Sequence, residues 1–266
     1  MPLGNGFLLA IPRLLGILRT SRRFPHTTFP FARMLGCDFL ISRGVHCVVA
    51  GKISTARETE TATALQLAGQ VDEEGFPARA SWDNVAATRF DRDWQGNNPD
   101  PQRKSEVRLL WSPDVLYLRF LARYRGITVF TDAEPNGRRD QLWERDVAEV
   151  FLQPPESSAR HYKEIEVSPN GFWIDLDIAP GEKRGLRSGL RRRVKVDDQN
   201  KTWIAELALP MKSLTANFDP TKAWRANFFR VEGASEPRFY SAWRPTATPV
   251  PNFHIPESFG KLVFET

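Results

Sequence analysis

The sequence has few of the residues that build disulfide frameworks and histidine-based active sites. Its 266 residues include only two cysteines and four histidines. Both cysteines, Cys37 and Cys47, lie near the N-terminus, which excludes a disulfide framework for the rest of the chain. Only His161 and His254 lie beyond residue 57, and they are far apart in the sequence. We expect each to be a structural or loop histidine rather than a ligand or a base.

Long hydrophobic runs and the motifs of common enzyme classes are also missing. No stretch approaches the roughly 18 apolar residues of a membrane span, so we expect none. The sequence contains no phosphate-binding loop, dinucleotide-binding glycine pattern, HExxH, CxxC or nucleophile elbow. These absences leave no motif-based support for nucleotide, zinc-protease or serine-hydrolase chemistry.

The basic charge of the chain is confined to its first residues. The net charge is +5, but residues 1–57 alone carry eight Lys and Arg against one acid, so the remainder is slightly acidic. We therefore expect no nucleic-acid partner. A local basic stretch, residues 184–195, contains no aromatic residue, and it favours a solvated hairpin over a phosphate site.

Residues 1–60 predict an N-terminal extension rather than a folded domain. An apolar segment at residues 6–18 is broken by Pro12 and lacks a basic region before it, so it is a poor secretory signal. We expect this extension to be disordered or a degenerate targeting segment. Residues 55–67 predict a short helix or a linker, and residues 61–266 predict one domain.

That domain is rich in aromatic residues and short strand patterns. The chain has 8 Trp and 18 Phe against 3 Met, which is more usual for sheets than for helical bundles. Residues 106–111 and 115–124 predict a strand pair, residues 192–196 and 202–209 predict a hairpin, and residues 210–214 predict one helical turn. Trp111 is expected in the core. The fold class is therefore all-β: a single-domain antiparallel β-sandwich with jelly-roll or immunoglobulin-like layers.

The stretch from Leu142 to Leu176 concentrates the acidic and aromatic residues. Residues 147–152, 164–167 and 172–178 alternate with period two, and the Asn170-Gly171 pair predicts a hairpin turn. One side of these strands carries acids: Glu149, Glu164, Glu166, Asp175 and Asp177. We expect this acidic set to be an exposed strand face. A carboxylate pair for glycoside hydrolysis and a Ca²⁺ site remain as alternatives.

Several motifs, in this order, resemble one known family. They are L-W-E-R-D-V-A-E-V-F-L, Y-K-E-I-E-V-S-P-N-G-F-W-I-D-L, W-I-A-E-L-A-L-P-M-K-S-L, W-R-A-N-F-F-R-V-E and N-F-H-I-P-E-S-F-G-K-L-V-F. From about Leu65 to the C-terminus the chain is similar to family 9 carbohydrate-binding modules and the related DOMON-like sandwiches.

The resemblance implies a non-catalytic β-sandwich that binds a mono- or oligosaccharide. By that resemblance Trp143 stacks on the sugar, Glu149 bonds its hydroxyls, and Trp243 closes the site from the other side. We expect the helpers to be Arg145, Glu164, Glu166 and Asn252. The resemblance also implies a separately encoded glycoside hydrolase as partner, an extracytoplasmic location, and no cofactor apart from a structural calcium whose ligands the sequence does not identify.

Two other functions remain open at this stage. The strand carboxylates would allow a glycoside hydrolase-type enzyme. A DOMON-like haem site is the other, but the domain's only methionine is Met211, so a Met/His axial pair lacks support.

Overall fold

The computed structural model describes residues 60–266, which form thirteen strands and one short α-helix. The predictions for residues 1–59 lie outside these described residues. The strands are β1 (Thr61–Gln66), β2 (Thr88–Phe90), β3 (Ser105–Trp111), β4 (Val115–Arg123), β5 (Val147–Gln153), β6 (Tyr162–Val167), β7 (Trp173–Ala179), β8 (Glu182–Gly185), β9 (Arg191–Asp197), β10 (Thr202–Pro210), β11 (Trp224–Glu232), β12 (Phe239–Ala242) and β13 (Gly260–Glu265), and the helix is α1 (Met211–Leu214).

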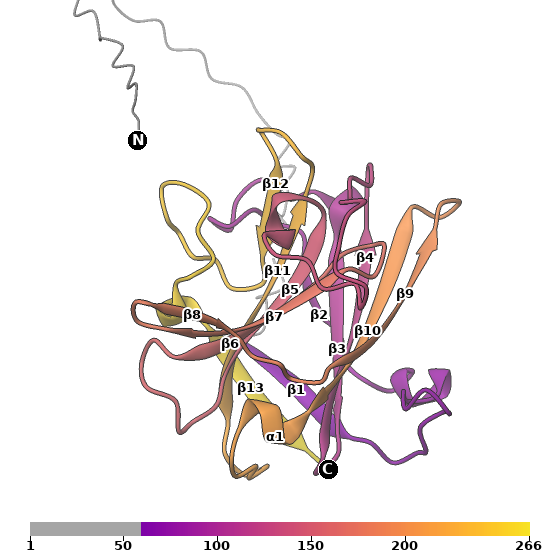
Figure 1. The fold of residues 1–266 in the computed structure, drawn as a ribbon, viewed down its shortest axis with the longest axis vertical. Helices are drawn as coiled ribbons and strands as arrows, with labels where there is room; N and C mark the ends of the chain where they lie inside the picture. The colour runs from indigo at the N-terminus through magenta and orange to yellow at the C-terminus, as the bar shows by residue number, and fades with distance from the viewer. Residues whose placement is uncertain (1–59) are drawn as a thin grey trace, which may run out of the picture. The chain divides into compact units, whose positions relative to one another are not determined.

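The strands form one continuous sheet that curls over itself into two layers (Figure 1). The order is β8-β7-β6-β5-β11-β13-β1-β3-β4-β10-β9, with β12 added beside β11 and β2 beside β3. One layer contains β5, β6, β7 and β11, the other contains β3, β4, β9 and β10, and β13 and β1 join them. The all-β sandwich expected from the sequence is confirmed. It is antiparallel except at β1, which pairs in parallel with both β13 and β3.

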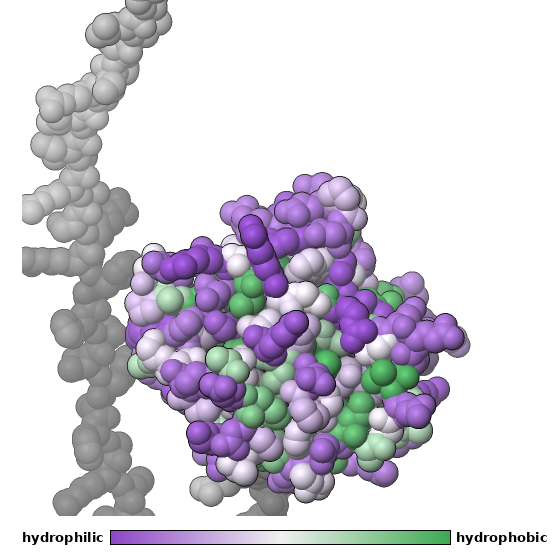
Figure 2. Space-filling view, turned by 60° about the horizontal axis from the view of Figure 1, so that its bottom comes forward, coloured by the Kyte–Doolittle hydropathy of each residue, from purple (hydrophilic) through white to green (hydrophobic). Residues whose placement is uncertain are grey.

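Most large hydrophobic side chains are buried or half-buried. Among residues 60–266, only Val71 and Val250 are clearly exposed. On the face in Figure 2, hydrophobic side chains form small separate patches among hydrophilic ones. Nor does any helix within residues 60–266 have the length and hydropathy needed to cross a membrane.

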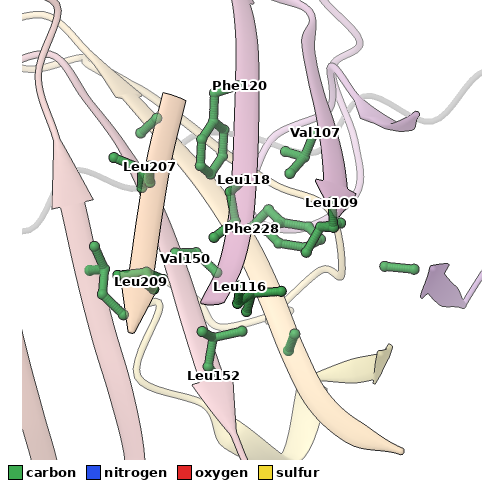
Figure 3. Close-up of a cluster of buried hydrophobic side chains, with 14 of the residues drawn as sticks. Val107, Leu109, Leu116, Leu118, Phe120, Val150, Leu152, Leu207, Leu209 and Phe228 are labelled. Carbon is green, nitrogen blue, oxygen red and sulfur yellow. The ribbon is translucent and has the colours of Figure 1, made fainter. Parts of the chain in front are cut away.

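The main core lies between the two layers (Figure 3). Leu116, Leu118 and Phe120 of β4 meet Val150 of β5 and Phe228 of β11 across it. Residues at alternate positions of a strand point to one face, so the period-two pattern of each strand decides which side chains enter this core. The strand predicted over residues 115–124 and the core position predicted for Trp111 are both confirmed.

A second apolar cluster lies on the outer face of the β5–β6–β7–β11 layer. Val147 and Phe151 of β5 join it, whereas Ala148, Val150 and Leu152 of the same strand enter the main core. Every residue of β5 is therefore buried. This outer cluster positions the candidate site described below.

One local prediction is wrong and two are confirmed. Residues 61–66 form the strand β1 rather than a helix or linker, because β1 is held between two strands that are distant in the sequence. The β9–β10 hairpin and the helical turn after Pro210 are present as predicted.

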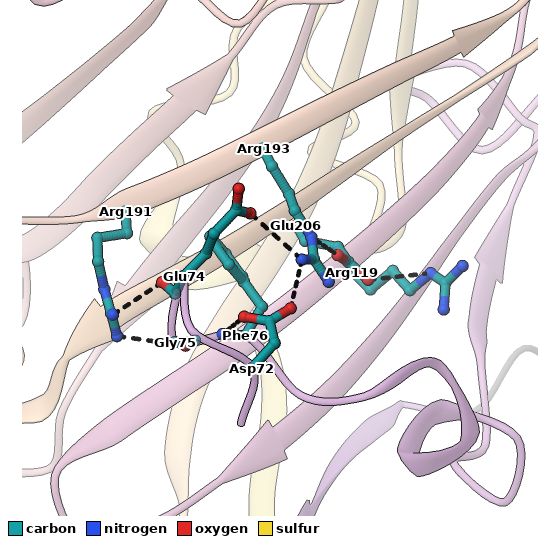
Figure 4. A network of polar contacts seen from close by, with 8 residues as sticks. All are labelled: Asp72, Glu74, Gly75, Phe76, Arg119, Arg191, Arg193 and Glu206. Carbon is teal, nitrogen blue, oxygen red and sulfur yellow. Dashed lines mark hydrogen bonds and ion pairs between the residues drawn. The ribbon is translucent and has the colours of Figure 1, made fainter. Parts of the chain in front are cut away.

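The basic stretch at residues 184–195 is engaged within the protein (Figure 4). Arg193 pairs with Asp72, Glu74 and Glu206, and Arg191 donates to the carbonyl oxygens of Glu74 and Gly75. These contacts tie β9 and β10 to residues 72–75. The solvated hairpin predicted for residues 184–195 is wrong, because this stretch runs from the end of β8 to β9, and these two strands lie at opposite ends of the sheet.

Candidate functional site

A cavity of about 250 Å³ opens on the outer face of the β5–β6–β11 layer. Its floor comes from strand residues, and its walls come from β12, from the 3-10 turn η3 (Leu142–Glu144) and from the proline-rich segment before β13. The lining residues are Trp143, Glu149, Glu164, Glu166, Val231, Arg238, Tyr240, Pro251, Asn252, Phe253 and His254.

The strand register brings three glutamates together on the cavity floor. Glu149 of β5 lies directly opposite Glu166 of β6, and Glu164 lies two residues earlier on the same face of β6. The intervening Ile165 points into the main core. Directly opposed like charges destabilise a sheet, so such an arrangement calls for a chemical explanation.

The three glutamates are buried, which corrects the exposed strand face expected from the sequence. Glu149, Glu164 and Glu166 are 3%, 2% and 0% exposed. The reason is that β12 and the segment at residues 251–254 cover this face, and both come from the far end of the chain.

Four oxygen atoms of these glutamates lack a donor among the described residues. They are Oε1 of Glu149, Oε2 of Glu164 and both side-chain oxygens of Glu166. Burial, followed by the charge of Glu164, raises the pKa of Glu149 well above its usual value. Burial, followed by the charges of Glu149 and Glu164, does the same to the pKa of Glu166. The site therefore holds protons at a pH where exposed glutamates are ionised.

Trp143 lies on η3 at the rim of the cavity and is half-buried. Its carbonyl oxygen accepts a hydrogen bond of 2.9 Å from Nη1 of Arg238, which ties η3 to β12. The ammonium of Lys183, on β8, lies 3.7 Å from the centre of the indole ring. The ring thus presents a face that a cation occupies in the unliganded protein.

Phe253 anchors the segment that covers the glutamates. Its ring stacks on Phe229 of β11, with centroids 4.2 Å apart and planes 13° apart. Asn252 and His254, on either side of Phe253, line the cavity. Nδ1 of His254 shares a hydrogen bond of 2.6 Å with the Tyr162 hydroxyl and lies 3.8 Å from Oε2 of Glu164.

Arg238 and Tyr240 build a further wall of the cavity. The Arg238 guanidinium lies 4.8 Å from the centre of the Tyr240 ring. Both side chains bond to Glu236: Nε of Arg238 at 3.2 Å and the Tyr240 hydroxyl at 2.6 Å. Burial and the hydrogen bond to Glu236 raise the pKa of Tyr240 to about 12, so its hydroxyl stays protonated at neutral pH.

Five of the seven site residues named from the sequence line this cavity: Trp143, Glu149, Glu164, Glu166 and Asn252. Arg145 and Trp243 do not. The guanidinium of Arg145 lies 4.7 Å from the centre of the Phe130 ring and donates to the carbonyl oxygen of Glu144.

Trp243 is a core residue in the structure, which corrects its expected place opposite Trp143. It is 1% exposed, and its ring lies 5.3 Å from that of Phe228 in the main core. Gly260 leaves room for it, because a Cβ there would lie 2.6 Å from the indole ring.

Asp175 and Asp177 also lie away from the cavity, on the opposite face of β7. Nζ of Lys163 and Nε2 of His161 each lie 2.6 Å from Oδ1 of Asp177, and the backbone amide of Ser188 donates to Asp175. The lining residues that sequence reasoning missed are Val231, Arg238, Tyr240, Pro251, Phe253 and His254. The alternation in N-F-H is the one local signal that could have identified His254, since it puts an aromatic anchor between two polar residues.

A metal site is not evident in the part of the chain that the structure describes. Among residues 60–266, no group of three or more His, Cys, Asp or Glu side chains has the geometry to hold a metal ion. The structural calcium remains a prediction from the family resemblance.

Comparison with known proteins gives a family match over most of the domain. Residues 75–265 match the family described as carbohydrate family 9 binding domain-like. A curated relative, an extracellular protein of Arthroderma benhamiae, is 24% identical over 196 residues, which cover 67% of this chain and 86% of the relative.

Solved structures share the fold. A candidate carbohydrate-binding protein of Bacteroides uniformis has a TM-score of 0.63 at 16% identity, over 77% of this chain and 99% of its own. A family 9 carbohydrate-binding module of Caldicellulosiruptor kristjanssonii, in complex with glucose, has a TM-score of 0.55 at 15% identity. The match covers 77% of this chain and 95% of that module. The same organism's family 9 module in complex with cellotriose has a TM-score of 0.54 at 14% identity. The match covers 77% of this chain and 93% of that module.

Proposed function

Since the chain belongs to the carbohydrate family 9 binding domain-like family, we propose that it binds a mono- or oligosaccharide in the cavity beside Trp143. The domain grips the sugar without transforming it. Glu149, Glu164 and Glu166 accept hydrogen bonds from sugar hydroxyls, and Trp143 packs against the apolar C–H face of the ring.

The observation that carries this proposal is a set of four buried carboxyl oxygens that have no donor among residues 60–266, next to a half-buried tryptophan. Leaving a buried acceptor unpaired costs about 1–3 kcal/mol. A sugar offers several hydroxyl donors on a compact ring, together with an apolar face for an aromatic side chain. Few other neutral ligands satisfy both features at once.

The size of the cavity favours one sugar ring inside it. Pockets for drug-sized ligands hold about 300–1,000 Å³, whereas this cavity holds about 250 Å³. Further units of an oligosaccharide would extend over the rim. The complexes of the Caldicellulosiruptor kristjanssonii module with glucose and cellotriose make glucose and its β-1,4 oligomers the first probes to test.

The setting we propose is extracytoplasmic, beside a glycoside hydrolase encoded separately. The extracellular relative from Arthroderma benhamiae supports this location. A binding domain in that setting would hold a sugar chain near an enzyme that cleaves it.

A glycan array probed with the full chain, with and without calcium, tests the proposal. Retention of a defined set of saccharides, competed by the free sugars, is the expected result. Failure to retain any saccharide under either condition would refute it. A difference between the two conditions would reveal whether calcium contributes.

Hydrolysis is the second candidate function, and the raised pKa of two buried glutamates favours it. Glycosidases pair a protonated carboxyl with an ionised one across the scissile bond. Turnover of a chromogenic glycoside that Glu149→Gln abolishes would establish hydrolysis. Saturable binding of a saccharide that the protein leaves uncleaved would establish the binding function instead.

A further inference from the structure

The unpaired acceptors in the cavity all belong to carboxyl groups, which bind a charged donor more strongly than a neutral one. Its three glutamates lie within one strand pair, and four of their oxygen atoms meet no donor among residues 60–266. Three basic side chains face this cluster: Lys183, Arg238 and His254. Whether any of them neutralises it decides which ligand the cavity prefers.

Each of these basic groups is directed elsewhere. Arg238 donates to the carbonyl oxygen of Trp143 and pairs with Glu236. Lys183 places its ammonium against the Trp143 ring. His254 bonds to Tyr162, and its Nδ1 stays 3.8 Å from Glu164, beyond hydrogen-bond reach. Among residues 60–266, no cationic side chain therefore donates a hydrogen bond to the four unpaired oxygens.

The Trp143 ring is suited to a positive charge as well as to a sugar face. The ammonium of Lys183 lies 3.7 Å from the ring centre, which is within the range of a cation–π contact. Lys183 itself is exposed at the end of a long, flexible side chain, so a ligand can displace it. The Lys183 ammonium thus lies at the mouth of an acidic cavity.

Resting on the function proposed above, we propose that the preferred ligands are sugars with a free amino group, such as 2-amino-2-deoxyhexoses and their oligomers. The ligand's ammonium has three donors and a charge, so it satisfies several of the unpaired oxygens of Glu149, Glu164 and Glu166 at once. The C–H face of the same ring packs on Trp143. An N-acetylated sugar lacks the charge and adds bulk where the carboxyl groups converge.

A proton release distinguishes this binding mode from that of a neutral sugar. Burial and mutual repulsion raise the pKa of Glu149 and Glu166 well above the usual value, so the cavity retains protons at a pH where exposed glutamates are ionised. Lys183 and Arg238 oppose this rise, and Glu164 adds to it. An entering ammonium stabilises the ionised carboxylates and expels those protons, whereas a hydroxyl does not.

Isothermal titration of the full chain with glucosamine, N-acetylglucosamine and glucose tests the proposal. The titrations are done below the pKa of the sugar amine, in two buffers of different ionisation enthalpy. Glucosamine is expected to bind at least about tenfold more tightly than either neutral sugar, a factor that corresponds to one charge-assisted hydrogen bond. Its binding heat should differ between the buffers because protons are released, and the heat for glucose should not.

Variants locate the effect in the cavity. Glu166→Gln should weaken glucosamine binding by a larger factor than glucose binding, whereas Asp132→Asn, at an exposed acid outside the cavity, should leave the ratio of the two affinities unchanged. Glucose binding at least as tightly as glucosamine would overturn the amino-sugar preference and leave the proposed function intact. Binding of neither sugar class, in these titrations and on the array, would overturn both.

Discussion

Glu149 and Glu166 lie directly opposite each other on β5 and β6, and both side chains are buried. Two like charges in this position oppose folding, because both carboxyl groups are buried and three of their four oxygen atoms have no donor among the described residues. A fold under selection for stability alone would place apolar side chains here. The pair is best explained by a ligand that supplies donors, and it has consequences that can be measured without that ligand.

The first consequence is a loss of stability as the pH rises. Unfolded glutamates titrate near 4.5, and the folded pKa values of Glu149 and Glu166 lie well above this. The folded state therefore holds more protons than the unfolded state between these values, and the free energy of unfolding falls as pH rises through that window. We expect Glu166→Gln to gain roughly 1–2 kcal/mol at pH 8 and little at pH 4, since one pKa unit corresponds to about 1.4 kcal/mol.

Urea denaturation at the two pH values measures this change. The exposed acid Asp132 provides the control, and Asp132→Asn should have the same free energy of unfolding as the parent at both pH values. A Glu166→Gln protein that is less stable than the parent at pH 8 would show that the charged pair is not the unfavourable contact described here.

The proposed function predicts that Lys183 competes with the sugar for the face of Trp143. Its ammonium lies 3.7 Å from the ring centre, and an exposed contact of this kind is worth about 0.5–1 kcal/mol. We expect Lys183→Ala to bind neutral sugars about two- to fivefold more tightly, measured by titration calorimetry. Lys195→Ala, which removes a lysine from β9, should have no effect. Weaker binding by the Lys183 variant would mean that the ammonium contacts the ligand instead.

Phe253 determines whether the covering segment stays in place. Its ring stacks on Phe229 at 4.2 Å, and Asn252 and His254, which flank it in the sequence, line the cavity. We expect Phe253→Ala to cost roughly 3 kcal/mol of unfolding free energy and to weaken sugar binding as well. The neighbouring Val250 is 68% exposed, so Val250→Ala should change neither property. Full affinity in a folded Phe253 variant would remove this segment from the site.

The two tryptophans named from the sequence should respond in opposite ways. Trp243 is 1% exposed in the core, so Trp243→Phe should lower the urea midpoint while the folded protein keeps its sugar affinity. Trp143 is half-buried at the cavity rim, so Trp143→Ala should lose affinity at nearly unchanged stability. Loss of sugar binding by a folded Trp243→Phe protein would restore the role first expected for that residue.

The sequence was sufficient to predict those strands whose own residues alternate between apolar and polar. Alternation placed Ala148, Val150 and Leu152 on the core face, and it put Glu149 on the other. It did not reveal that Glu149 is buried, because the cover comes from Tyr240 and Phe253 about a hundred residues later. Alternation predicts which side chains share a face of the sheet. Only the tertiary structure shows which other segments cover that face.

The failures at β1 and Trp243 have the same physical origin. Residues 61–66 carry no strong strand signal of their own, and two parallel partners that are distant in the sequence, β3 and β13, hold them in the sheet. Trp243 follows β12 in a proline-rich region, where exposure was a reasonable expectation. Its burial depends on the space above Gly260, which belongs to a different strand.

Titration of the full chain with the tightest neutral saccharide from the array, for the parent, Trp143→Ala and Trp173→Phe, tests the central claim most directly. Trp173 is also half-buried but lies outside the cavity, so its variant controls for the loss of a tryptophan. Saturable binding by the parent and the Trp173 variant, with at least a tenfold loss in Trp143→Ala, is the expected result. Equal affinities in all three proteins would contradict the assignment of this cavity as the sugar site.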